Sequence, residues 1–443
     1  MSTRSNALKM IALGCVSAAI LAACGKSDGG STKLGKAEAV DTNIPVTFNF
    51  FGNSAQDQDY FNRYYGDALK KKFPKYTFNY IQKVTGVDFA SLIAAGTPID
   101  FYYATIGNLE SALLQYGMEV DMTDLIKMYG LDTTKFEPSQ LNAMRLNTGG
   151  KVYGVPIQGN IQIMYYNKGI FDRFGVAYPK DNMTWDDAAE LTKKLTRSDG
   201  GKQFFGFGQS TSHILRSNQL SLARFDAKTN LPIITTETKW KLFYETIYQK
   251  MMPGEAYKKA FTDSPSKLGS INTFMKDQDT AMFAFFAQMH LTNPNELKTF
   301  DWDVVTLPTF KEAPGIGSQQ YPMMFGITKQ TKNVPAAMEV LKYMSGEEYQ
   351  VGLARKGWMS SLTLPAVQKE YGQDTEFKDK NWKSLFALKP APIPYTPDFD
   401  PSLVNAYVAI VPDVVKQTSD LNTLFRGVDE KSKKIMEEAQ RAK

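Results

Sequence analysis

The chain has 443 residues, of which 43% are hydrophobic and 22% are charged, and its formal net charge is +5. This length favours two or more hydrophobic cores, and the apolar fraction is too high for a disordered chain. Two histidines argue against a His-rich metal centre, two cysteines are too few for a Cys-rich zinc site, and no dense Lys/Arg block points to nucleic acid. We therefore expect a globular protein without metal, cofactor or nucleic-acid partner.

The N-terminus is typical of a secretory signal. Arg4 and Lys9 precede an apolar run over residues 10–23, which is too short to cross a bilayer. A basic start, a short apolar run and small residues before a cleavage site are the pattern of a signal peptide. The run ends in Leu21-Ala22-Ala23-Cys24-Gly25, which resembles the lipobox of bacterial lipoproteins and implies acylation of Cys24. A plain signal peptide with an incidental cysteine is the alternative.

Three expectations follow from this signal. Residues 1–23 are removed as a lipoprotein signal peptide, and residues 24–43, which begin small and polar, form a flexible tether. Cys15 leaves with the signal, so no disulfide within the mature chain is possible. The protein is then held by a lipid on the extracellular face of the cell membrane, or on the periplasmic side of a membrane in a Gram-negative cell.

The body alternates strand and helix patterns. Strands are predicted at 44–51, 76–81, 99–104, 151–156, 162–166 and 302–307. Helices are predicted at 60–73, 89–95, 184–195, 240–251 and 333–344, and from residue 421 onward. Asp88 and Thr184 are expected N-caps, with Asp187 placed for a capping box. This alternation predicts an α/β fold with a mostly parallel sheet.

Motifs of common enzymes are missing. The sequence has no Gly-x-Ser-x-Gly, no phosphate loop and no Gly-x-Gly-x-x-Gly. Gly206-Phe207-Gly208 lacks the third glycine and predicts a turn at a strand end. His213 and His290 lack metal-ligand spacing and are expected to form hydrogen bonds. We predict that the protein is not an enzyme. A lyase or glycosidase anchored to the envelope stays an alternative, since an acid pair can come from any part of the chain.

Motifs between residues 150 and 187 carry a resemblance to a known family. They are Gly150-Lys151-Val152-Tyr153-Gly154-Val155-Pro156, Tyr165-Tyr166-Asn167-Lys168, Phe171-Asp172-Arg173-Phe174-Gly175 and Thr184-Trp185-Asp186-Asp187, with supporting matches at 94–100, 280–282, 305–309 and 326–329. In this order they are similar to the family-1 extracellular solute-binding proteins of ABC importers, the group that includes the maltose-binding protein. The resemblance implies an α/β, two-lobe, periplasmic-binding-protein-like (type II) fold with a ligand cleft and a hinge between the lobes.

The resemblance also implies how the chain is divided. Lobe 1 is expected to contain residues 44–157 and 307–345, and lobe 2 residues 158–306 and 346–443. Hinges are expected near 155–158 and near 306–310, where Pro156 and Pro308 end strands without needing a ladder donor. The Tyr-Asn-Lys motif and Trp185 are expected to be scaffold, with Trp185 packed inside the second lobe.

A sugar is the expected ligand, because sugar sites combine stacking aromatic rings with amide and carboxylate side chains. Asn160 stands where the maltose-binding protein has an acidic cleft residue, and Trp358 is either a cleft aromatic or part of the core. The candidate ligand-binding residues are Asn53, Gln56, Asp57, Tyr103, Thr105, Gln158, Asn160, Gln162, Gln209, His213, Gln288 and Trp358. The function implied is a monomeric, lipid-anchored receptor that delivers a sugar or oligosaccharide to the transmembrane subunits of an ABC permease. A receptor for another solute, such as a peptide, is an alternative.

Overall fold

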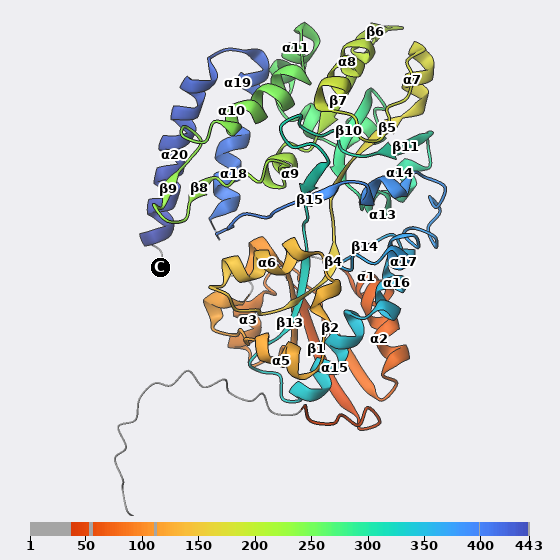
Figure 1. Ribbon diagram of the computed structural model, residues 1–443, viewed down its shortest axis with the longest axis vertical. Coiled ribbons are helices and arrows are strands. Elements are labelled where there is room, and N and C mark those ends of the chain that lie inside the picture. The colour runs from red at the N-terminus through yellow and green to blue at the C-terminus, as the bar shows by residue number, and fades with distance from the viewer. Residues whose placement is uncertain (1–36, 53–55, 110–112, 398, 442–443) are drawn as a thin grey trace, which may run out of the picture. The chain divides into compact units, whose positions relative to one another are not determined.

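The computed structural model describes residues 37–52, 56–109, 113–397 and 399–441, and its strands form two main sheets with helices packed against each (Figure 1). The first sheet has the strand order β14-β4-β13-β3-β1-β2. Its strands are β1 (Val46–Gly52), β2 (Tyr76–Ile81), β3 (Phe101–Thr105), β4 (Val155–Gly159), β13 (Met323–Ile327) and β14 (Met359–Ser360). β1 pairs in parallel with β2 and β3, whereas β13 is antiparallel to both β3 and β4.

The second sheet has the strand order β11-β5-β10-β7-β6. Its strands are β5 (Gln162–Asn167), β6 (Arg197–Asp199), β7 (Lys202–Gln209), β10 (Thr280–Phe286) and β11 (Trp302–Val305). Only β7 and β10 pair in parallel there, so both sheets are mixed and the predicted mostly parallel sheet is wrong. The reason is that β5 and β13 enter their sheets directly from the other lobe, without the helical crossover that makes neighbouring strands parallel. Two small sheets pair β8 (Phe225–Asp226) with β9 (Leu231–Pro232), and β12 (Ile316–Gln319) with β15 (Lys389–Ala391).

Each sheet has its own set of helices. Those that contribute to the core of the first sheet are α1 (Gln58–Phe61), α2 (Asp67–Lys72), α3 (Phe89–Ala94), α5 (Thr123–Met128), α6 (Pro138–Asn147), α15 (Val334–Met344), α16 (Glu347–Arg355) and α17 (Pro365–Gln368). Those of the second are α7 (Lys168–Phe174), α8 (Trp185–Leu195), α9 (Thr211–Arg216), α10 (Lys239–Tyr244), α11 (Glu255–Asp263), α12 (Asn272–Met275), α13 (Met289–Thr292), α14 (Pro294–Leu297), α18 (Asp400–Ala409), α19 (Val411–Lys416) and α20 (Leu421–Arg441). None of the helices in the described ranges is both long and apolar enough to span a membrane.

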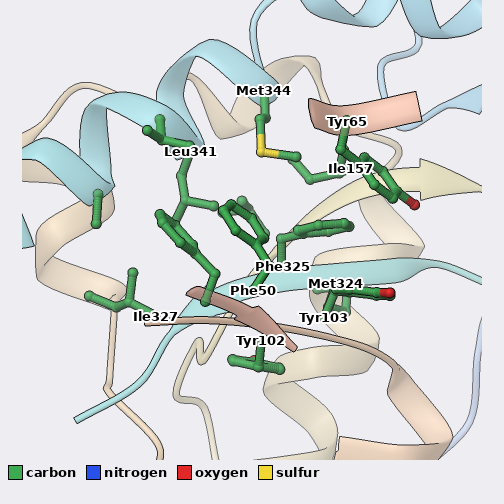
Figure 2. Packing of buried hydrophobic residues seen from close by; sticks show 14 of the residues in the cluster. Phe50, Tyr65, Tyr102, Tyr103, Ile157, Met324, Phe325, Ile327, Leu341 and Met344 are labelled. Carbon is green, nitrogen blue, oxygen red and sulfur yellow. The ribbon is translucent and has the colours of Figure 1, made fainter. Parts of the chain in front are cut away.

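The first core is built mainly from aromatic rings on β1, β3 and β13, covered by aliphatic side chains of α15 (Figure 2). Phe50 stacks on Phe101 with ring centroids 4.5 Å apart, and Tyr103 stacks on Phe325 at 5.1 Å. Leu341 is fully buried above them. These aromatic side chains therefore contribute to the packing of the first core.

Three predictions of local structure can be compared with the fold: the capping box of α8, the burial of Trp185 and the helix over 60–73. The capping box of α8 is confirmed: the Asp187 amide donates to Thr184 Oγ1 at 3.2 Å, and the Thr184 amide donates to Asp187 Oδ2 at 2.9 Å. Trp185 is buried in the second core, as predicted for scaffold. The continuous helix predicted over 60–73 is instead interrupted by a π-helical turn, η1 (Asn62–Gly66), which buries Tyr64 and Tyr65.

The chain crosses between the lobes later than the sequence predicted. The segment near 306–310 is not a hinge, because Leu307 and Phe310 are buried in the second core and the Trp185 amide donates to the Thr309 carbonyl at 3.0 Å. The crossing lies instead between β12 and β13, at 320–322. Tyr349 and Leu353 of α16 pack in the first core, so the boundary expected at 345/346 also needs correction.

Gly206 and Gly208 lie inside β7, so the turn predicted for them is wrong. A Cβ atom on Gly206 would come within 2.4 Å of the backbone of Thr192. Gly206 therefore allows α8 to pack directly on the strand, where any side chain would separate the helix from the sheet.

Candidate functional site

A small cavity of about 30 Å³ lies where the crossing segment Gln319–Tyr321 meets parts of both lobes. The first lobe contributes η2 (Ile106–Asn108), the short helix that follows β3. Its lining residues are Ile106, Gly107, Asn108, Arg216, Ser217, Arg224, Gln319, Gln320, Tyr321, Ile393, Thr396, Asp400 and Pro401. Amide, hydroxyl and guanidinium groups predominate, so the cavity suits a ligand with many hydrogen-bonding groups.

Backbone and amide hydrogen bonds hold the crossing segment against the second lobe. The Gln319 amide donates to the Ser217 carbonyl at 3.1 Å, and Gln319 Nε2 donates to the Asn218 carbonyl at 2.9 Å. Gln320 Oε1 accepts a hydrogen bond from Gln140 Nε2 of α6, which belongs to the first lobe. The two neighbouring glutamines therefore attach the crossing to opposite lobes.

Tyr321 contacts both lobes through its backbone amide, its hydroxyl group and its aromatic ring. Its amide donates to the Asn160 carbonyl at 2.8 Å, on the other crossing. Its hydroxyl donates to Thr105 Oγ1 of the first lobe at 3.3 Å, and its ring lies 5.7 Å from that of Phe286 in the second. A change in the angle between the lobes must therefore alter the contacts of Tyr321.

Two arginines and one carboxylate supply the charge of the cavity wall. Arg224 and Asp400 form a buried ion pair, with side chains only 2% and 3% exposed, through a hydrogen bond from Arg224 Nε. Arg224 Nη1 is buried and has no hydrogen-bond partner among the described residues. Arg216, at the last residue of α9, is half-buried and forms no ion pair within the described ranges. Burial of the His213 ring is the main cause that lowers its pKa from 6.5 to about 4, and the positive charge of Arg216 lowers this pKa further.

None of the described residues predicted from the sequence lines this cavity, and their part in binding stays a prediction. One group of them meets in the first lobe. The Tyr103 hydroxyl donates to Gln56 Oε1 at 3.2 Å, and the Tyr65 hydroxyl donates to Gln158 Oε1 at 2.7 Å. The rings of Tyr65 and Tyr103 lie 6.0 Å apart, so these amides share one aromatic neighbourhood. Asp57 is exposed and caps α1.

A second group meets at the edge of the second lobe. Gln162 Nε2 donates to the His213 carbonyl at 3.0 Å, and the His213 ring lies 4.8 Å from Phe286. Through Tyr321, this group connects to Asn160 and to Thr105 in the first lobe.

Three further candidates are Gln209, Gln288 and Trp358. Gln209 is fully buried near Tyr248, and Gln288 begins α13. Trp358 is partly buried and packs edge-on against Tyr60 and Tyr64, at 6.3 and 5.9 Å, and the Tyr60 ring lies 6.2 Å from that of Tyr65 in the first group. Asn53 and the lipidation residue Cys24 lie outside the described residues.

Sequence reasoning missed the residues that line the cavity. Arg224 and Asp400 are separated by 176 positions, and no local pattern connects them. Gln319-Gln320-Tyr321 did carry a usable signal, since a polar run followed by Pro322 between two strands is typical of a connection outside a sheet.

His290 predicts a measurable dependence of stability on pH. It is 1% exposed, its Nδ1 donates to the Ala287 carbonyl at 2.8 Å, and burial lowers its pKa from 6.5 to about 4. Because the unfolded chain binds the proton more tightly, this contribution to stability is complete above pH 6.5 and is lost as pH falls towards 4. Between pH 7 and pH 4.5 we expect a loss of about 2–3 kcal/mol from this group.

Urea unfolding at both pH values, for the wild-type chain and for His290→Gln, measures that contribution. The variant is expected to lose less stability on acidification by this amount, whatever its stability at pH 7. Equal pH dependence in the two proteins would contradict the prediction.

The described residues contain no cluster of His, Cys, Asp and Glu that could hold a metal ion. Two lobes joined by chain crossings, with a polar cavity at one crossing, define a binding protein that holds a small solute between its lobes. The chain matches the family model of the bacterial extracellular solute-binding proteins over residues 52–351. It belongs to that family, whose members bind solutes rather than transform them.

Relatives agree with this assignment. The chain is 22% identical to the sn-glycerol-3-phosphate-binding periplasmic protein of Pectobacterium atrosepticum over 379 residues, covering 80% of this chain and 81% of that protein. Among solved structures, a sugar transporter of Rhizobium etli in an open conformation has a TM-score of 0.68 at 18% identity, with 87% of this chain and 99% of that chain covered. A Listeria monocytogenes substrate-binding protein in complex with cycloalternan has a TM-score of 0.64 at 16% identity, with 88% and 99% covered. These structural likenesses confirm the two-lobe fold.

Proposed function

We propose that the protein is the receptor of an ABC importer, which captures a sugar or oligosaccharide between its lobes and delivers it to the permease. The cavity at Gln319–Tyr321 carries the proposal, because its wall offers both donors and acceptors to a hydroxyl-rich ligand. Neighbours of the same fold bind carbohydrate, among them the Listeria protein and a mannobiose-binding protein with a TM-score of 0.62 at 17% identity.

The remaining parts of the proposal concern location and assembly. The lipobox-like sequence at Cys24 supports a lipid anchor, which would keep the folded body at the outer face of the membrane beside the permease. We expect the receptor to act as a monomer, with closure of the lobes around the sugar as the signal that the permease recognises.

A thermal-shift screen of the whole purified chain tests this function. Neutral mono- and oligosaccharides, uronates, sugar phosphates, peptides and polyamines are compared. A ligand of the native state at 100 times its Kd stabilises the protein by about 2.7 kcal/mol, which is a clear rise in Tm. We expect such a rise with a carbohydrate and a smaller one in Tyr321→Ala, which removes the residue that contacts both lobes. A rise with a peptide or a polyamine and with no carbohydrate would refute the proposal.

A further inference from the structure

The cavity wall carries more positive than negative charge. Among the described lining residues two are cationic, Arg216 and Arg224, and one is anionic, Asp400. Asp400 neutralises Arg224 within the buried pair, so the charge of Arg216 is left without a partner. Its position at the end of α9 is beside the crossing segment, because Ser217, the next residue, accepts the hydrogen bond from Gln319.

Arg224 has donor capacity that the protein does not use. Its Nε atom binds Asp400, while Nη1 is buried without a hydrogen-bond partner among the described residues. Leaving a buried guanidinium N–H unpaired is costly, and natural proteins satisfy nearly all such groups. An oxygen atom of a ligand in this cavity would remove that cost.

From these two observations, and resting on the proposed function, we propose that the ligand is an acidic carbohydrate whose single anionic group is bound by Arg216 and Arg224. A guanidinium group matches the geometry of a carboxylate or a phosphate with paired hydrogen bonds. The anion is therefore the carboxylate of a uronic acid or the phosphate of a sugar phosphate. Gln319, Gln320 and Tyr321 line the same cavity, and the sugar hydroxyls would be bound by those atoms of the three side chains that the hydrogen bonds to Asn218, Gln140 and Thr105 do not use.

Binding of matched pairs of probes tests the proposal. Calorimetry with the whole chain compares glucose, galactose and mannose, and their disaccharides, with the corresponding uronates and 6-phosphates. We expect at least one acidic probe to bind at least ten times more tightly than its neutral counterpart. The uronates and the sugar phosphates are measured as two separate sets of probes. The set that binds more tightly shows whether the anion is a carboxylate or a phosphate.

Arg216→Gln is the decisive variant, since Arg216 forms no ion pair with any described residue and its loss leaves the buried pair intact. It is expected to reduce the preference for the acidic probe over its neutral counterpart by tenfold or more. Arg426→Gln makes the same change of charge on the exposed face of α20, outside the cavity, and is expected to leave the preference unchanged. Circular dichroism and Tm establish that both variants are folded.

The outcomes separate the inference from the function on which it depends. A neutral sugar that binds as tightly as its acidic partner, or a preference that survives Arg216→Gln, overturns the inference and leaves the sugar receptor standing. Absence of binding by every carbohydrate in both arms overturns the two together.

Discussion

Replacing Arg224 by methionine is expected to destabilise the second lobe by about 3–5 kcal/mol, because it leaves the Asp400 carboxylate buried without its charge partner. Both side chains are almost completely excluded from water, and desolvation of an unpaired carboxylate is among the largest penalties in proteins. Urea unfolding at neutral pH measures the loss.

The double variant Arg224→Met/Asp400→Leu is the informative control. Removing both charges together leaves no buried ion, so most of the stability is expected to return, and the coupling energy follows from the double-mutant cycle. Lys193→Met, which breaks an exposed pair with Glu190, is expected to cost no more than about 1 kcal/mol. A double variant as unstable as Arg224→Met would contradict the explanation.

Trp185→Ala is expected to lower the free energy of unfolding by a similar amount, about 3–5 kcal/mol, because it leaves a cavity beside Phe207 and Phe310. Its ring is 1% exposed, and its Nε1 donates to Gln219 Oε1 at 2.9 Å. Gln219 Nε2 in turn donates to the Pro308 and Ile316 carbonyls, at 2.8 and 3.0 Å. Trp185 therefore supports the segment that leads to the crossing.

Trp185→Phe separates the two contributions of that side chain. Phenylalanine keeps most of the apolar contact and removes the donor to Gln219, so we expect a loss of about 1–3 kcal/mol. Leu146→Ala, at a position 53% exposed, is expected to change stability by no more than about 0.5 kcal/mol. Equal losses in Trp185→Phe and Trp185→Ala would show that the hydrogen bond, and not packing, dominates.

The buried pair has a consequence for binding as well as for stability. Arg224 is held in place by Asp400 before any ligand arrives, so its free N–H does not have to be ordered on binding. Groups that are ordered in advance cost less conformational entropy when a ligand binds. Arg216 has no such partner among the described residues, so in the proposed complex its side chain is the group that becomes ordered upon binding.

Two of the crossings between the lobes lie at Asn160–Ile161 and Gln320–Pro322, and a third lies between α17 of the first lobe and α18 of the second. The first two are joined by the hydrogen bond from the Tyr321 amide to the Asn160 carbonyl. Because this hydrogen bond joins the two crossings, we expect bending at one of them to move the other when the lobes close.

The sequence by itself determined the family, the α/β class and the local structure whose causes are local. The capping box of α8 needs only residues three positions apart. Helical spacing also predicted the burial of Trp240, Tyr244, Ile247 and Met251, although the helix predicted over 240–251 is α-helical only to Tyr244 and continues as the π-helix η5 (Glu245–Lys250). The family motifs at 150–187 implied the two lobes before any coordinates were considered.

Tertiary structure alone decided where the chain crosses between the lobes and which side chains line the cavity. The sequence predicted a hinge near 306–310. Leu307 and Phe310 are instead buried in the second core, and the chain crosses between the lobes at Gln320–Pro322. Arg224 meets Asp400 only because α18 returns to the second lobe after the chain has built the first. Such contacts depend on the free energy of packing across the whole fold, which no pattern of neighbouring residues records.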